Sequence, residues 1–291
     1  MESCQVEKVL HHLSSDLKMI NILTGLGPHS STFSCPFCEG RKGDWNENSP
    51  LRTFSSITKH FTAFVQSGSN KSKAKECFSC INSPIIKSDV NDNDIVLMLC
   101  PPPVLHLRLG IVNSLMSELF NVCPELEKQI EKELNVIRKP YHGNAYEGKQ
   151  TQKILSNLQC LRTHVDDDQS KSVIQVLEHF HAVDQAAFGM VLGNGVKGAV
   201  KKFEESYHRH QDEFHGGKKV TGTKVHIVMH HLEQFVTATG KPLGQFNEET
   251  VENKHHEFLK VYQSYKVNSR DSKMYKDNLL RCVLHFNSYR I

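Results

Sequence analysis

The sequence predicts a mainly α-helical fold with a small amount of β-structure near its start. Apolar residues recur at helical spacing through most of the chain after residue 104, whereas residues 6–13 are ambiguous between a strand and a helix. The sequence contains no internal repeat and no low-complexity tail. Its 291 residues, 38% hydrophobic and 23% charged, suffice for one large or two smaller domains.

The first predicted helix follows Asp16, in the segment LKMINILTGLG. Asp16 is the expected N-cap, because an aspartate side chain can accept a hydrogen bond from the first helical turn. The helix should end at Gly25 and Gly27. Its broad apolar face predicts a buried element and consists of Leu17, Ile20, Ile22, Leu23 and Leu26.

The later segments are predicted from turn-forming residues and helical spacing. Segments 40–56 and 66–76 are rich in Gly, Asn, Ser and Lys and are predicted loops. The short apolar run DIVLMLC stops at the three prolines 101–103. Helices are then predicted at about 105–120, 124–137, 149–162, 170–188, 195–212, 222–238, 247–266 and 272–288.

Charge and cysteine usage narrow the class of protein. The net charge of +3 gives no strong overall field for nucleic acid. Nine cysteines without an apolar leader sequence predict a reducing, intracellular environment, in which CxxC pairs bind metal more often than they form disulfides. No stretch approaches the roughly 20 apolar residues of a membrane-spanning helix, so no membrane association is expected.

A metal site is predicted around Cys35 and Cys38, whose CxxC spacing lets two thiolates share one tetrahedral ion. Two candidates exist for the other half of the site. Cys77 and Cys80 form a second CxxC pair, with 38 residues between the two pairs. The alternative lies in VHIVMHH, where three histidines fall on one predicted helix.

Helix geometry favours one histidine pair over the other. His226 and His230 are four residues apart, which places their side chains about 40° apart around an ideal helix. His226 and His231 are separated by about 140°. Geometry alone therefore favours His226 and His230, unless His226 lies near the start of the helix.

An acidic candidate lies in the helix predicted at 247–266. Glu252 is next to Val251 and seven residues from Leu259, so it borders the apolar face of this helix. A carboxylate at that border could hold a cation. The ordinary alternative is that acids in the first turns of a helix serve as caps and solubilising groups.

These residues together resemble a known family. Cys35 follows Asp16 by nineteen residues, His226xxxxHis231 lies near the end of the chain, and Glu252 follows about twenty residues later. The pattern resembles the catalytic core of the recombination-activating protein that cuts antigen-receptor genes, and of Transib-type and related cut-and-paste transposases. The segments that extend the likeness are VLHLRLGIVNSLMSELF, YHGNAYEGKQTQKIL and SRDSKMYKDNLLRCVLHF.

The resemblance implies an RNase H-like core that is interrupted by a helical, zinc-bound insertion. Residues 1–34 would form part of that core, 35–240 the insertion, and 241–291 the C-terminal helices that complete the core. Asp16 would match the second catalytic aspartate and Glu252 the catalytic glutamate of the Asp-Asp-Glu (DDE) triad, with Glu249 an adjacent acid. The implied zinc ligands are Cys35, Cys38, His226 and His231, so the resemblance favours His231 over His230.

The first aspartate of the triad has no counterpart here. In the family it lies well before the second, whereas only 15 residues precede Asp16. The core is therefore expected to be incomplete. In the intact enzymes the three carboxylates hold two divalent ions, about 4 Å apart, for strand transfer at a phosphodiester. This chain would supply only two of the three carboxylates, so we expect no nuclease activity from the chain alone. Mg²⁺ or Mn²⁺ is expected as a cofactor only if the chain is catalytic.

The sequence is compatible with three functions. The first is a transposase-derived, DNA recombinase-like fragment with a structural zinc site, located in the nucleus. The second is a zinc-stabilised module that binds protein or DNA, and the third is part of a longer active transposase. DNA, a protein partner and a second copy of the chain are all possible partners.

A basic surface is the only sequence feature that would favour DNA contacts directly. Lys201, Lys202, Lys218 and Lys219 flank a histidine-rich helix and could contact phosphates. Acidic residues lie among them, and a solvated surface of mixed charge is the competing interpretation. The interspersed acids are Glu204, Glu205, Asp212 and Glu213.

Overall fold

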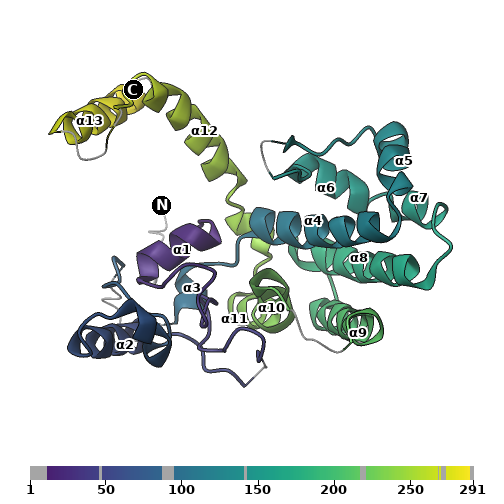
Figure 1. Ribbon diagram of the computed structural model, residues 1–291, viewed down its shortest axis with the longest axis horizontal. Helices are drawn as coiled ribbons and strands as arrows, with labels where there is room; N and C mark the ends of the chain where they lie inside the picture. The colour runs from purple at the N-terminus through teal and green to yellow at the C-terminus, as the bar shows by residue number, and fades with distance from the viewer. Residues whose placement is uncertain are drawn as a thin grey trace, which may run out of the picture. The chain divides into compact units, whose positions relative to one another are not determined.

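The computed structural model describes residues 12–45, 48–86, 95–140, 143–216, 221–267, 269 and 273–288. The chain divides into two units, residues 1–247 and 248–291. Both units are built from helices, which confirms the predicted mainly α-helical class (Figure 1). In the described residues, β-pairing consists of isolated bridges such as that between Cys38 and Leu51. Residues 6–11 of the ambiguous opening segment lie outside the described residues.

The first helix forms at the predicted position, although Ile22 of its predicted buried face is 48% exposed. Helix α1 spans Leu17–Thr24, and the Oδ1 atom of its N-cap Asp16 accepts a hydrogen bond from the backbone N–H of Met19 at 2.7 Å. Gly25 ends the helix in the left-handed conformation, at φ 78°. A side chain at this position would be strained in that conformation and would also meet the backbone of Asn82. The sequence signals for both ends are therefore confirmed.

The two predicted loops are only partly correct. Helix α2 spans Phe54–Gln66, so residues 54–56 are helical, and a 3-10 helix, η1, spans Lys71–Cys77. Thr53 and Ser56 form a reciprocal capping box at the start of α2, because each side chain accepts a hydrogen bond from the other's backbone N–H. The apolar run before the prolines forms a single helical turn, α3, at Val96–Leu99.

The longer helices of the first unit lie where helical spacing predicts them. Helices α4 and α8 lie side by side, with α9 packed on α8 (Figure 1). The predicted helix at 149–162 is divided into α6 and α7. The bounds are α4 Val104–Val122, α5 Glu125–Leu134, α6 Gly148–Leu155, α7 Leu158–Arg162, α8 Asp168–Ala187 and α9 Val196–Phe214.

The predicted helix at 222–238 is also divided, and its break lies at a candidate ligand. Helix α10 spans Thr223–His230 and α11 spans Leu232–Thr239, with His231 between them at φ −115° and ψ −21°. A short 3-10 helix, η3, follows at Leu243–Phe246. Helical hydrogen bonds are kept across this break, from the His231 N–H to the Ile227 carbonyl at 2.9 Å and from the Phe235 N–H to the His231 carbonyl at 3.0 Å, so it is a local distortion at His231.

The core of the first unit is apolar and contains a buried ion pair. The Nε atom of Arg108, in α4, lies 2.7 Å from Oδ1 of Asp184, in α8, and both side chains are largely buried. Pairing of this kind compensates the cost of removing each charge from water. Fully buried apolar side chains around the same helices include Leu107, Leu119, Phe180 and Phe203.

The second unit is a helical pair. Helix α12 spans Glu249–Gln263 and α13 spans Lys273–Ser288. Phe258 and Phe286 pack edge to face at 5.3 Å between ring centroids, and the Tyr265 hydroxyl lies 2.9 Å from Nδ1 of His285. The described helices of the chain include none long and apolar enough to cross a membrane. The predicted three-part division at residues 34 and 240 stays a prediction.

The N-cap of α1 is testable by substitution. Asp16→Ala should lower the free energy of unfolding by about 1 kcal/mol, because the Met19 N–H loses its acceptor, while Asp16→Asn should lose less. Urea denaturation of the full chain measures both. Asp44→Ala, at an exposed loop position, is the matched control and should change stability by less than about 0.5 kcal/mol. Equal effects of Asp16→Ala and Asp44→Ala would contradict the capping role.

Candidate metal centre

Four buried side chains from distant parts of the sequence converge in the first unit. Cys35 and Cys38 lie in the loop between α1 and α2, His226 lies in α10, and His231 lies at the break between α10 and α11. Their sulfur and nitrogen atoms all lie within 4.8 Å of one another. The structure thus brings together the four residues that the resemblance implies, in a group that could hold a metal ion.

The distances in this group fit tetrahedral coordination. The Cys38 Sγ atom lies 3.2 Å from Nε2 of His226, and Cys35 Sγ lies 3.5 Å from Nε2 of His231. The two Nε2 atoms are 3.2 Å apart. A tetrahedral zinc ion with ordinary bond lengths separates a sulfur from a nitrogen ligand by about 3.5 Å and two nitrogens by about 3.3 Å. The group therefore needs little rearrangement to bind zinc.

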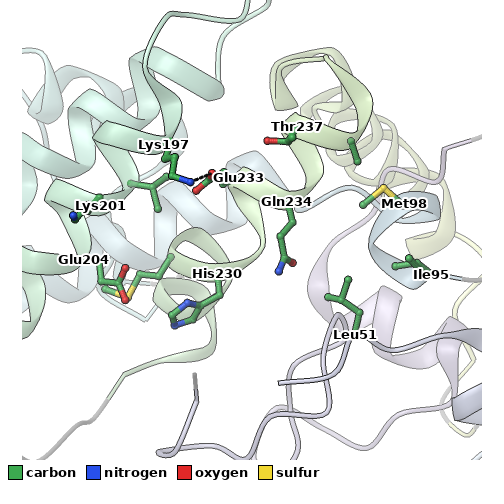
Figure 2. A pocket seen from close by; sticks show the side chains of 13 residues that line it. Leu51, Ile95, Met98, Lys197, Lys201, Glu204, His230, Glu233, Gln234 and Thr237 are labelled. Carbon is green, nitrogen blue, oxygen red and sulfur yellow. Dashed lines mark ion pairs between the residues drawn. The ribbon is translucent and has the colours of Figure 1, made fainter. Parts of the chain in front are cut away.

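His231, and not His230, joins the group. The expectation from an ideal helix, that His226 pairs with His230, is therefore wrong, and the φ of −115° at His231 departs from the regular helix on which that expectation is based. His230 instead lines an open pocket of about 870 Å³ formed with Leu51, Met98 and other residues (Figure 2). Burial, followed by the nearby His226 and His231, lowers the pKa of His230 to about 4.

The cysteine loop is shaped to present two sulfurs in one direction. The backbone N–H of Phe37 points to Cys35 Sγ and that of Gly40 to Cys38 Sγ, each at 3.4 Å. Such hydrogen bonds stabilise thiolates. A Cβ atom at Gly40 would lie 2.7 Å from the Trp45 ring and 3.2 Å from Cys38 Sγ, so this tight turn requires glycine.

The two thiols are electrostatically unequal. The hydrogen bond with Cys35 lowers the pKa of Cys38 to about 2, against the opposing effect of burial and with help from His226 and His231. Burial and then the neighbouring Cys38 raise the pKa of Cys35 well above its ordinary value. The group thus supplies a thiolate at neutral pH, the form of cysteine that binds metal.

The histidines are held by their surroundings. The Nδ1 atom of His231 lies 3.0 Å from Oε1 of Gln234, an outer contact that fixes the ring with Nε2 directed at the sulfurs. The Trp45 ring stacks on His226 at 4.4 Å and 19°. All four candidate ligands are at most 2% exposed. A closed site with four protein ligands has the character of a structural metal site, because no position is left for a substrate.

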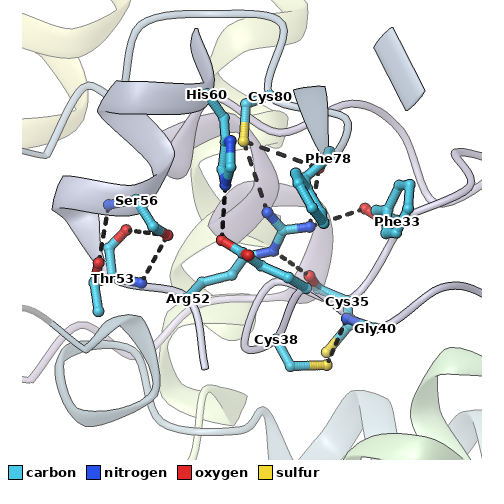
Figure 3. Close-up of polar contacts among 11 residues, drawn as sticks. Phe33, Cys35, Cys38, Gly40, Arg52, Thr53, Ser56, His60, Phe78 and Cys80 are labelled. Carbon is cyan, nitrogen blue, oxygen red and sulfur yellow. Dashed lines mark hydrogen bonds and ion pairs between the residues drawn. The ribbon is translucent and has the colours of Figure 1, made fainter. Parts of the chain in front are cut away.

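A buried arginine joins the cysteine loop to the second CxxC segment. Arg52 is completely buried, and its guanidinium donates to the carbonyl oxygens of Cys35, Phe33 and Phe78 at 2.9, 3.3 and 3.0 Å (Figure 3). Its Nη1 atom also lies 3.7 Å from the sulfur of Cys80. The side chain therefore joins two segments by their backbones, residues 33–35 of the cysteine loop and Phe78 beside the second CxxC pair.

Cys77 and Cys80 have a different environment from the first pair. Burial raises the pKa of Cys80 to about 11 despite the neighbouring Arg52. In the part of the chain that the structure describes, neither Cys77 nor Cys80 belongs to a group of three or more possible metal ligands. The four-cysteine alternative is therefore not supported, and Cys80 is an acceptor for Arg52.

Asp16 lies near the metal centre but outside it. It lines a pocket of about 650 Å³, whose wall also includes Ser34 and Pro36 of the cysteine loop. Glu252 lies in α12 of the second unit, and its side chain is outside the described residues. The pairing of Asp16 with Glu252 stays a prediction. The same holds for the role of Glu249, whose side chain is also outside the described residues.

The lysine surface shows mixed charge where it is described. The Nζ atom of Lys201 lies 3.8 Å from Glu205, and both side chains are exposed. Lys202 is exposed on the same helix, α9. Lys218 and Lys219 lie outside the described residues. An exposed pair of this kind contributes little to stability and agrees with a solvated surface.

Comparison with known proteins adds no family assignment. No protein-family model and no curated protein matches the chain. The function of the chain is therefore inferred from its residues and their geometry.

The role of Arg52 is testable separately from metal binding. Arg52→Met should lower the free energy of unfolding by about 3 kcal/mol or more, because one buried and two partly buried carbonyls lose their donor. Arg162→Met is the matched control, since Arg162 pairs with Glu178 on the surface, and it should cost less than about 1 kcal/mol. Denaturant titrations of both variants give the comparison. A loss for Arg52→Met no larger than that for Arg162→Met would contradict the bridging role.

Proposed function

We propose that Cys35, Cys38, His226 and His231 bind one structural zinc ion. Near-tetrahedral spacing, complete burial and the low pKa of Cys38 support zinc over a hard cation, which prefers oxygen ligands. The ion would connect distant parts of the chain, since Cys38 and His226 are 188 residues apart and Cys35 and His231 are 196 residues apart. Binding free energy at such a site contributes directly to folding.

We also propose that the chain is a DNA recombinase-like protein related to the DDE cut-and-paste transposases. Its core would be RNase H-like, with residues 35–240 as the zinc-bound insertion. The observation that supports this most is the membership of His231 in the cluster. The family resemblance implies His231 as a ligand, whereas ideal helix geometry favours His230. The presence of His231 in the cluster therefore agrees with the resemblance and would not be expected from helical spacing alone.

The pocket beside Asp16 supports an interaction with phosphodiesters. Among the described residues, its wall carries five side chains that are basic, three lysines and two histidines, and a single carboxylate, that of Asp16. Lys224 on this wall is half-buried, and this burial lowers its pKa from the ordinary value. Basic groups around a concave surface favour phosphate oxygens. The five are Lys18, His29, Lys42, His106 and Lys224.

Catalysis would need a third carboxylate in addition to Asp16 and Glu252. Asp16 and Glu252 would supply two of the three carboxylates that hold Mg²⁺ or Mn²⁺ in this class of enzyme, and those ions would supply activation of water or a 3′-hydroxyl. The resemblance assigns the third carboxylate to no residue of this chain. A nuclear location and a second copy or protein partner follow from the same proposal.

The zinc site is tested by metal analysis of the purified chain after extensive dialysis. We expect about one tightly bound zinc per chain, lost in Cys35→Ser and in His231→Gln because each removes a ligand. His230→Gln is the matched control and should retain the ion, since His230 faces the neighbouring pocket. Zinc that survives both Cys35→Ser and His231→Gln would place the ion elsewhere.

DNA binding is tested with duplex DNA in a filter-binding salt series. We expect affinity to fall steeply with salt concentration, and Lys42→Gln to weaken binding and reduce the salt slope by about one. Lys128→Gln is the control, because Lys128 lies exposed on α5 beside Glu125. A flat salt dependence would contradict the DNA proposal.

The nuclease expectation uses the same preparations. With Mg²⁺ or Mn²⁺ we expect no cutting by the 291-residue chain alone, since too few carboxylates would hold the ions. Cutting that Glu252→Ala abolishes, and that Glu257→Ala on the same helix leaves intact, would contradict that expectation and favour an active transposase.

The second candidate is a zinc-stabilised module that binds a protein. The pocket beside His230 favours it, because Leu51, Ile95, Met98 and Met229 contribute an apolar surface rimmed by charged side chains (Figure 2). Apolar pockets with a polar rim are typical of binding sites. A protein-binding module should show no steep salt slope in the duplex-DNA measurement, so the salt series separates the two functions.

A further inference from the structure

A second group of metal-binding side chains lies away from the cysteine centre. Glu118 of α4, His210 of α9 and His215, the C-cap of α9, converge although about 90 or more residues separate the glutamate from the histidines along the chain. The Oε1 atom of Glu118 lies 2.6 Å from Nε2 of His210 and 2.7 Å from Nε2 of His215. Three possible ligand atoms thus meet around one point.

His210 is oriented as a ligand histidine. Its side chain is completely buried, and its Nδ1 atom lies 3.0 Å from the Ser172 hydroxyl of α8. At 2.6 Å from a carboxylate oxygen, Nε2–H donates to Glu118. A metal ion would replace that proton, and Nδ1–H could then donate to Ser172 while the Nε2 lone pair faces the ion. An outer hydrogen bond that fixes the tautomer in this way is the usual companion of a histidine ligand.

The opposite side of the group is accessible. The side chain of His215 is 37% exposed and that of Glu118 is 21% exposed. Three donors around a tetrahedral ion lie about 3.4 Å apart, so binding requires the present contacts to lengthen by about 0.7 Å. His215 can provide that movement, because it follows the last residue of α9 and its side chain reaches solvent.

The donor set favours a particular class of ion. Two imidazole nitrogens and one carboxylate oxygen suit zinc and other divalent first-row transition metals better than magnesium or calcium. Three protein ligands leave a coordination position for water, unlike the closed cysteine centre. A bound ion would therefore exchange with solvent more easily here.

A third group, of Glu133, Cys160 and His164, is a weaker candidate. The Cys160 thiol donates to Glu133 at 2.9 Å, and burial, followed by that hydrogen bond, raises the pKa of Cys160 to about 11. This cysteine stays protonated at neutral pH and is a poor ligand in that form. Glu133 is also the more exposed carboxylate, at 43%.

We propose that Glu118, His210 and His215 form a second, exchangeable site for a divalent transition-metal ion such as zinc. The site lies on the α4, α8 and α9 helices, retains an open coordination position, and is independent of the cysteine centre. It does not depend on the proposed DNA function.

Equilibrium dialysis of the full chain against micromolar zinc tests this site. We expect the wild type to bind one more equivalent than either His215→Ala or Glu118→Gln. His164→Ala, which removes a ligand from the third group, is the matched control and should bind as much as the wild type. All variants keep the four ligands of the cysteine centre. The difference in bound zinc between wild type and variant therefore reports the second site, whether or not the cysteine centre contains an ion.

Cobalt spectra distinguish the sites chemically. Cobalt at the second site should add weak visible bands without thiolate-to-cobalt charge transfer, because no sulfur ligand is present, and His215→Ala should remove those bands. Equal zinc uptake by the wild type and His215→Ala would overturn the proposal. So would loss of the additional equivalent in His164→Ala, which would assign the ion to the third group.

Discussion

The first unit depends on the convergence of two sulfurs and two imidazole nitrogens in a fully buried space. Polar groups removed from water are costly unless they find partners. The cysteine sulfurs receive backbone N–H groups, His231 has Gln234, and the four ligand atoms contact one another. The Nδ1 atom of His226 has no hydrogen-bond partner among the described residues. The cysteine loop and the α10–α11 break thus provide most of the partners that this buried group needs.

Arg52 extends that constraint to the rest of the N-terminal region. Its guanidinium contacts the backbone of Cys35 and of Phe78, and its own backbone carbonyl accepts from Val96 at the start of α3. Through its side chain and its own backbone carbonyl, Arg52 thereby connects the cysteine loop, the second CxxC segment and the turn before the prolines. The 3-10 segment around Cys77 and Cys80 is thus part of the support of the centre, although its cysteines are not ligands in the described group.

Local signals in the sequence predicted local structure well. Asp16, followed by apolar residues at helical spacing and then Gly25, predicted α1 and both of its ends. The capping box of Thr53 and Ser56 was a readable signal for α2 that the turn-rich composition of residues 40–56 obscured. The break at His231 could not be predicted, because MHHLEQ contains neither glycine nor proline. It arises from tertiary contacts, and so do the partners of Arg52 and the Glu118 group, which no local spacing encodes.

Burial of the cysteine centre also has a kinetic consequence. A chelator cannot contact an ion whose four ligands are at most 2% exposed, so release has to wait for the cysteine loop to separate from the α10–α11 break. At high chelator concentration the rate of metal loss would then stop rising and would equal the rate of that opening. The limiting rate of metal loss would therefore measure how often the cysteine loop separates from helices α10 and α11.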